Sequence, residues 1–259
     1  MEPSKAQALI AKLRDEIARR QTTASPDRPV LASGFAPLDA LLPGGGFPLG
    51  RVVELCGPPA SGKTTLALLA LSQATRGGQL AAFVDPAGEL YPPAARALGA
   101  DLSRLLVVRP RDEELGARAA ALLARSRAFA AVVADLPRLA GPAGPWSRRL
   151  LEAAETGRTA MVVLSAAPTG LDASVRVNVE RTSEAELLLT VERNRMGPPG
   201  RTARGRLPLP EELGAPAAPE DGRAPDGRRG PSSSVEGSPT ARLVLLPGAD
   251  QLRAPAREP

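Results

Sequence analysis

The chain has 259 residues, enough for one full-sized domain, and a formal net charge of +5 at pH 7. Aromatic residues make up only 2% of it, so the core has to be built from Leu, Val and Ala. The single cysteine, Cys56, and the lack of histidine exclude a disulfide framework, a zinc site and a histidine base. No apolar run approaches the roughly 18 residues of a membrane helix, and residues 1–5 lack the apolar stretch of a secretory signal. We therefore expect a cytoplasmic protein with no membrane partner.

The N-terminal segment is predicted to be helical over residues 4–21. Leu9, Leu13 and Ile17 repeat at a spacing of four residues, with charges on the opposite face. A connector rich in Pro, Ser and Thr follows. The helix could pack on its own domain or on a neighbouring subunit, and the sequence leaves both open. Residues 1–29 are therefore predicted to be a separate unit and a candidate oligomerisation element.

Residues 30–209 show short apolar runs that alternate with longer amphipathic runs, which is typical of an α/β domain with a mostly parallel sheet. Strands are expected at Val52–Cys56, Leu80–Val84, Leu105–Val108, Ala131–Asp135 and Met161–Ser165. Helices are expected at Lys63–Thr75, Pro92–Leu98, Asp112–Arg127 and Ser147–Thr156. A hairpin of Ser174–Glu180 and Glu186–Arg193 is predicted to extend the sheet in antiparallel fashion.

The C-terminal segment loses this periodicity. Gly, Pro, Ser and Arg dominate residues 210–259, so we predict a disordered tail. From Thr202 onward the numbers of basic and acidic residues are equal, so this segment lacks the net positive charge of a nucleic-acid-binding arm. The tail contains one apolar segment, Leu243–Leu246, which could return to the sheet as a strand or dock on a partner. The sequence leaves both open.

A phosphate-binding loop follows the first predicted strand. Residues 57–64 match the pattern G-x-x-x-x-G-K-[ST] completely, between an apolar strand and a helix rich in Leu and Ala. The amides of such a loop and the helix N-terminus favour phosphate oxygens. Lys63 is expected to contact the β- and γ-phosphates and the Thr64 hydroxyl to bind Mg²⁺, so ATP and Mg²⁺ are the expected cofactors. The predicted nucleotide-binding residues are Gly57, Pro58, Pro59, Ala60, Ser61, Gly62, Lys63, Thr64 and Thr65.

Asp135 is the candidate for a second Mg²⁺ contact. It ends the run Ala131–Asp135, which consists of four small or apolar residues and then a carboxylate. A strand that ends in Asp beside a phosphate loop is where P-loop enzymes hold Mg²⁺ or its water. The alternative role is a helix cap or a turn residue.

Residues 33–110 resemble the RecA recombinase family. The matching residues are Gly34, Leu38–Asp39, Gly44–Gly45, Pro48, Gly50–Glu54, Gly57–Pro58, Ser61–Leu66, Ala82–Asp85, Ala95–Arg96, Leu98–Gly99, Asp101, Leu105–Leu106 and Pro110. The segment Lys5–Ile17 also resembles the short helix with which that family binds the adjacent protomer. The resemblance implies a RecA-like P-loop NTPase core.

Several positions depart from the family pattern. The glutamate that activates water in the family corresponds here to Ala87, two residues after Asp85, and Glu89 is the candidate substitute base. The glutamine that senses the γ-phosphate corresponds to Ala166, and the aromatic that stacks on adenine to Ala94. Since hydrolysis needs a group on the attacking water, we expect weak or no ATPase activity.

The DNA-binding loops of the family correspond to two short segments, residues 136–146 and 166–174. Trp146 in the first could stack on DNA or anchor a helix start, so single-stranded DNA is left open as a ligand. Arg193 and Arg195 resemble the cationic finger that this superfamily projects onto the nucleotide of a neighbouring subunit. They could instead be a solvated pair at a strand end.

The combination of a RecA-like core, lost catalytic residues, short DNA loops and a Pro- and Arg-rich tail is similar to the ImuA family. That resemblance implies an accessory protein in SOS-type translesion synthesis. Its expected partners are an ImuB-like Y-family polymerase homologue, an error-prone C-family polymerase and RecA. One alternative is a DNA-stimulated ATPase of RecA or RadA type, and another is a regulator that joins or blocks RecA filaments.

Overall fold

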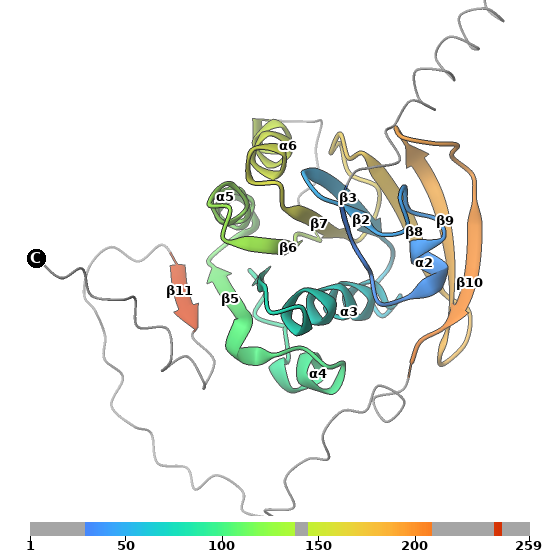
Figure 1. Ribbon diagram of the computed structural model, residues 1–259, viewed down its shortest axis with the longest axis horizontal. Coiled ribbons are helices and arrows are strands. Elements are labelled where there is room, and N and C mark those ends of the chain that lie inside the picture. The colour runs from blue at the N-terminus through green and yellow to red at the C-terminus, as the bar shows by residue number, and fades with distance from the viewer. Residues whose placement is uncertain (1–28, 138–144, 209–240, 245–259) are drawn as a thin grey trace, which may run out of the picture.

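The centre of the molecule is a nine-stranded sheet with helices on both faces (Figure 1). The computed structural model describes residues 29–137, 145–208 and 241–244, and they form the predicted α/β fold with a mostly parallel sheet. The strand order is β10-β9-β8-β3-β7-β6-β4-β5-β11. The predicted N-terminal helix and most of the predicted tail lie outside the described residues, so the unit boundaries at residues 29 and 209 stay predictions.

Six strands of the sheet are parallel. They are β3 (Arg51–Cys56), β4 (Leu80–Val84), β5 (Leu105–Pro110), β6 (Phe129–Asp135), β7 (Ala160–Ser165) and β8 (Val175–Arg181). Antiparallel strands extend it at both ends: β9 (Glu186–Asn194) and β10 (Thr202–Arg206) beyond β8, and β11 (Ala241–Val244) beyond β5. A separate pair joins β1 (Val30–Leu31) to β2 (Phe47–Pro48). Because the carboxyl ends of parallel strands share one edge, the loops after β3, β4, β6 and β7 meet there.

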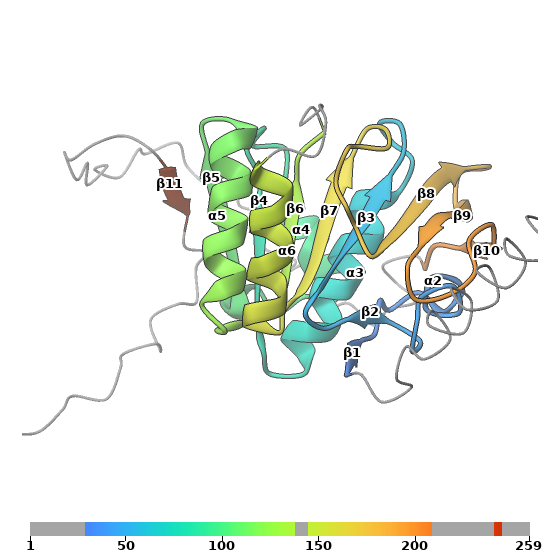
Figure 2. The same ribbon diagram turned by 90° about the horizontal axis from the view of Figure 1, so that it is seen from above.

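The helices divide between the two faces of the sheet (Figure 2). One face carries α3 (Lys63–Arg76) and α4 (Pro92–Ala97), and the other carries α5 (Glu113–Arg125) and α6 (Pro145–Gly157). The remaining helical turns are α2 (Ala36–Asp39) and the 3-10 segment Leu102–Arg104. Alternation along β3 sends Val53 and Leu55 to the core under α3 and Val52 to the core under α5 and α6. Among the described residues, no helix is long and apolar enough to span a membrane.

Local sequence signals explain where the helices start. Gly62 precedes α3, and Asp112 caps α5 by accepting a hydrogen bond from the Leu115 amide at 2.8 Å. Trp146 lies in the first turn of α6 and packs, half-buried, against the core under α5 and α6. Its place agrees with the helix-anchor interpretation, in which hydrophobic burial orients the start of the helix.

Strand pairing departs from the sequence predictions in two places. The predicted hairpin forms, since β8 and β9 pair antiparallel, but β8 joins the sheet parallel to β3 and not antiparallel. β10 was not predicted, since Thr202–Arg206 lacks apolar alternation; it packs through Gly205, where a Cβ would lie 2.3 Å from Pro37 Cγ. In the tail, Ala241–Val244 pairs with β5 as a strand, which agrees with the strand alternative for the apolar segment that begins at Leu243.

Candidate nucleotide-binding site

The phosphate loop joins the carboxyl end of β3 to the first residue of α3. The two glycines of the phosphate-loop pattern, Gly57 and Gly62, are both required by the geometry of the loop. A Cβ on Gly57 would lie 2.4 Å from the Val179 carbonyl oxygen, and Gly62 has a φ of 97°, with its Cβ position 2.9 Å from Leu187 Cδ2. The hairpin strands β8 and β9 therefore close one side of the loop. Only residues without a side chain fit at these two points.

Lys63 folds back over this loop. Its ammonium donates to the carbonyl oxygens of Gly57 at 3.1 Å and Pro58 at 3.2 Å, and the residue is 8% exposed. Burial lowers the pKa of Lys63, while the charge of Asp135 raises it. The Ser61 hydroxyl is also buried and is the one buried side-chain polar atom without a hydrogen-bond partner among the described residues. An ammonium held only by carbonyls and an unpaired hydroxyl fit a phosphate group, which would supply charge and acceptors to both.

Asp135 ends β6, but that strand does not adjoin β3. β7 lies between them, so Asp135 is one strand removed from the strand that leads into the phosphate loop, and its role as a Mg²⁺ ligand stays a prediction. Two strand spacings separate the backbones by about 10 Å. Burial raises the pKa of the Asp135 carboxyl from 3.8 to about 6, the charge of Lys63 opposes the shift, and Asp85, Glu89 and Glu113 add to it. Because β3, β7 and β6 are parallel, Asp135 lies at the same edge of the sheet as the phosphate loop.

The described residues fit a magnesium nucleotide at this edge. Thr64, half-buried at the start of α3, would supply the hydroxyl ligand and Asp135 the carboxylate. A divalent cation would also relieve the repulsion between the carboxylates that raises the pKa of Asp135. When bound, the cation would neutralise phosphate charge.

The loop after β4, residues 86–91, is fixed by a buried carboxylate. Asp85 is 1% exposed and accepts hydrogen bonds from the amides of Glu89 at 3.0 Å and Leu90 at 3.1 Å. Arg109 binds the same carboxylate through Nε at 3.2 Å and donates to the Leu90 carbonyl oxygen at 3.1 Å. This anchor holds Ala87, whose side chain is exposed and carries no carboxylate.

Glu89 lies at the rim of an open groove of about 440 Å³ beside this loop. The lining residues are Pro86, Ala87, Glu89, Arg111, Asp112, Glu113 and Pro137. Pro137 follows Asp135 closely in the chain, and the charge of Glu89 helps to raise the pKa values of both Asp135 and Lys63. Glu89 is thus on the nucleotide side of the loop, with an exposed side chain.

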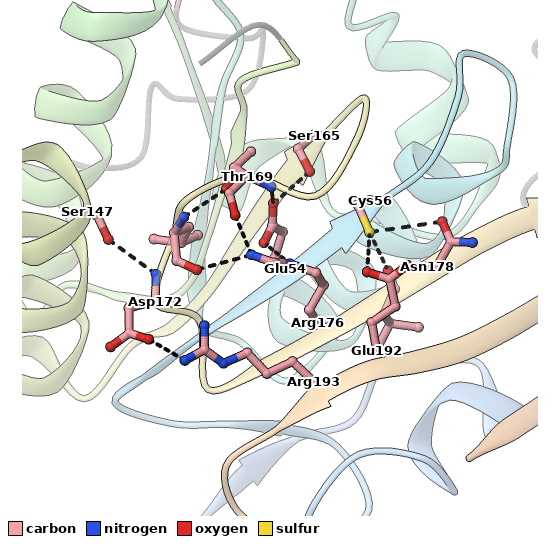
Figure 3. A network of polar contacts seen from close by, with 12 residues as sticks. Glu54, Cys56, Ser147, Ser165, Thr169, Asp172, Arg176, Asn178, Glu192 and Arg193 are labelled. Atoms are coloured by element: carbon pink, nitrogen blue, oxygen red, sulfur yellow. Dashed lines mark hydrogen bonds and ion pairs between the residues drawn. The ribbon is translucent and has the colours of Figure 1, made fainter. Parts of the chain in front are cut away.

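The loop after β7, residues 166–174, is fixed by a second buried carboxylate (Figure 3). Glu54, in the middle of β3, is 0% exposed and accepts hydrogen bonds from Ser165 Oγ at 2.9 Å and the Thr169 amide at 3.0 Å. Arg176 Nε binds its other oxygen at 2.6 Å. Arg176 Nη2 also donates to the carbonyl oxygens of Thr169 and Leu171. The loop after β7 is therefore tied to the strand that leads into the phosphate loop.

Neither Glu54 nor Arg176 was predicted to be a site residue. The available signal was a charged residue inside the apolar run Val52–Cys56, because a buried carboxylate requires a partner. Its partner is 122 residues away in the chain, so spacing alone could not identify it.

Arg193 and Arg195 converge on one carboxylate. Both guanidinium groups donate through Nη2 to Asp172 Oδ1, Arg193 at 2.5 Å. In the sheet Arg193 pairs with Arg176, which pairs with Glu54, three residues before Gly57. The two arginines thus lie beside the 166–174 loop and away from the phosphate loop of their own chain. Their role toward a neighbouring subunit stays a prediction.

Comparison with known proteins gives the family. The model for the RecA N-terminal domain matches residues 13–143, just over half of the chain. The chain belongs to the RecA N-terminal domain family. Protein RecA of Corynebacterium jeikeium (strain K411) is 49% identical over 105 residues, which are 40% of this chain and 28% of the relative. Protein RecA of Staphylococcus aureus (strain JH9) is 40% identical over 135 residues, which are 52% of this chain and 37% of the relative.

A solved structure extends the comparison beyond the family match. The RadB recombinase has a TM-score of 0.57 and 25% identity, and the alignment covers 68% of this chain and 95% of that one. Within the RecA N-terminal domain family, the matched segment includes the phosphate loop, Ala87 and Asp135. Asp172, Arg193 and the rest of their network lie beyond residue 143, outside the family match.

Proposed function

We propose that this chain is a RecA-like accessory protein in DNA-damage tolerance, of the kind found in the ImuA family. It binds ATP and Mg²⁺ at the phosphate loop and turns nucleotide over slowly or not at all. Its partners are an ImuB-like polymerase homologue, the associated error-prone C-family polymerase, and RecA. The names of the relatives, RecA and RadB recombinase, support a role in recombination or repair.

The observation that carries this proposal is the contrast between two neighbouring loops. The phosphate-loop pattern is complete, and the Lys63 ammonium on loop carbonyls and the unpaired Ser61 hydroxyl support phosphate binding. The loop after β4 is held firmly by Asp85, yet the position two residues later is Ala87. A water-orienting group on that loop contributes strongly to hydrolysis. Nucleotide would then serve as a structural ligand that stabilises the folded domain.

Steady-state ATP hydrolysis tests the nucleotide part of the proposal. The full chain is assayed with and without single-stranded DNA, beside Lys63→Ala, and nucleotide binding is measured on the same samples. The proposal expects binding by the wild type and turnover no greater than in Lys63→Ala. DNA-stimulated turnover that depends on Lys63 would overturn it.

A binding assay tests the adaptor part. The purified ImuB-like homologue is titrated with wild type and with Lys63→Ala, and the melting temperature of each is checked first. Retention of most of the affinity by Lys63→Ala supports an adaptor surface outside the phosphate loop. Loss of all binding in a folded Lys63→Ala protein would contradict it.

A DNA-stimulated ATPase is the second candidate, and Glu89 is the observation that favours it. Its charge reaches both Asp135 and Lys63, so a carboxylate is present on the nucleotide side of the loop. This candidate expects turnover that Glu89→Gln abolishes, and filaments on single-stranded DNA in electron micrographs. Absence of both at saturating ATP eliminates it.

A further inference from the structure

Asp172 binds two arginines at once. A single oxygen, Oδ1, accepts from Nη2 of Arg193 and from Nη2 of Arg195 (Figure 3 shows the Arg193 contact). The side chain of Arg193 is 36% exposed, that of Arg195 51% and that of Asp172 38%. Two guanidinium groups aimed at one oxygen form the arrangement that binds oxyanions, and water-soluble anions can reach it.

The Asp172 backbone is held independently of the two arginines. Its amide donates to Ser147 Oγ at 3.3 Å, and the preceding Leu171 carbonyl oxygen accepts from Arg176 at 3.1 Å. Two residues on, the Ser174 amide donates to the Val52 carbonyl oxygen at 2.9 Å. These bonds tie the residue to β3 and α6, so its carboxylate is presented to the arginines by a fixed loop.

The arginine pair is turned away from the phosphate loop of its own chain. Arg193 is level with Glu54 in the sheet, and Gly57 lies three residues further along β3. At about 3.3 Å per residue this is about 10 Å of strand, and both guanidinium groups are turned to Asp172 on the loop after β7. An anion that binds the pair in this arrangement is therefore separate from one held by the phosphate loop of the same chain.

We infer that Asp172 is a built-in ligand of a two-arginine oxyanion site and masks that site until a phosphoryl group from another molecule displaces it. The inference rests on the proposed role of Arg193 and Arg195 toward a neighbouring nucleotide and adds the regulation of that role. A triphosphate held by a second copy is the favoured source, because it concentrates several charges where a nucleic-acid backbone offers one per phosphate. With the Asp172 carboxylate present, the three side chains carry a net charge of +1. Without it, the two arginines carry +2.

The consequence is competition within the chain. When a site is open in only a fraction of molecules, its apparent affinity falls by that fraction. Asp172→Asn keeps the size of the side chain and the backbone bond to Ser147, but removes the negative charge that holds the arginines. The variant should then bind phosphate groups at this site more tightly than the parent.

Calorimetric titration with inorganic tripolyphosphate at low salt tests the inference, in a Lys63→Ala background that weakens phosphate binding at the phosphate loop. Asp172→Asn in that background should bind the probe roughly tenfold or more tightly than the Lys63→Ala parent. Adding Arg193→Gln and Arg195→Gln should remove the gain. Unchanged affinity in Asp172→Asn, or a gain that survives loss of both arginines, would overturn the inference. Because every protein in this titration carries Lys63→Ala, the result does not depend on whether the wild-type phosphate loop binds nucleotide.

Two further arms identify the source of the phosphate. With Lys63 intact, sedimentation of Asp172→Asn with a non-hydrolysable ATP analogue and Mg²⁺ should show self-association that the wild type lacks. Matched titration with a short single-stranded oligonucleotide should show no comparable gain. Oligonucleotide binding without nucleotide-dependent self-association would overturn the assignment to a second copy and point to a nucleic-acid backbone.

Discussion

The phosphate loop and the two loops beside it at the same edge of the sheet use their polar groups differently. The loops after β4 and β7 are each fastened by a buried carboxylate, Asp85 or Glu54, that binds an arginine and loop amides. The phosphate loop has no such anchor, and its Ser61 hydroxyl is buried without a partner among the described residues. Unpaired buried groups cost free energy unless a ligand satisfies them.

This difference separates binding from turnover. In the phosphate loop the Ser61 hydroxyl remains unpaired and the Lys63 ammonium is held by loop carbonyls, which suits an anion. In the neighbouring loops the polar groups are satisfied by the protein itself, which fixes these loops.

The largest effect is expected from restoring a carboxylate to the fixed loop after β4. Ala87→Glu places one on an exposed position of a rigid support, where it can orient water. We expect ATP turnover to rise by about 10²–10⁴-fold, the usual contribution of a positioned general base. The assay is phosphate release at saturating ATP and Mg²⁺. Ala87→Gln is the matched control, and equal rates in the two variants would contradict the interpretation.

The next largest effect is expected from breaking the ion pair that anchors the loop after β7. Arg176→Leu leaves the fully buried Glu54 without its cation, and removing one partner of a buried pair costs about 3–5 kcal/mol. The free energy of unfolding, from urea titration, measures the loss. Arg148→Leu removes an exposed ion pair and should cost less than about 1 kcal/mol. A loss of similar size in both variants would show that burial of Glu54 is not decisive.

Removal of the loop lysine should affect ligand binding more than stability. Lys63→Ala takes away the ammonium that the loop carbonyls orient, a charge-assisted contact worth about 1.5–3 kcal/mol. We therefore expect affinity for ATP with Mg²⁺ to fall by about 10- to 100-fold, as measured by calorimetry. The melting temperature without ligand should stay near that of the wild type. Undiminished affinity would mean that the loop does not hold the phosphates.

The smallest effect concerns the pH dependence of Asp135. Burial raises its pKa to about 6 in the folded protein, above the usual 3.8, so the folded state binds the extra proton between these values. The contribution of Asp135 to stability therefore falls as the pH rises through that window. Asp135→Asn lacks this dependence, and its melting temperature relative to wild type should increase from pH 4 to pH 7. A constant difference in melting temperature across that range would rule out the pKa shift. Added Mg²⁺ and nucleotide should raise the melting temperature of the wild type more than that of Asp135→Asn.

Much of the site was predictable because its signals are local. The phosphate loop is a contiguous pattern between a strand and a helix, and Asp135 ends an apolar run. Strand β10 was missed because Arg204 and Arg206 share a face with Thr202, while small Ala203 and Gly205 do the packing. Apolar periodicity, the main signal for a strand, is absent from such a segment.

The sequence by itself determined the α/β class and the phosphate-loop pattern, because each depends on residues close together in the chain. Only the tertiary structure decided that β7 separates Asp135 from β3, that Glu54 meets Arg176, and that Asp172 holds Arg193 and Arg195. Those facts depend on strand order and on pairs distant in sequence. A buried carboxylate must find a cation, and the packing of the sheet decides which cation it meets.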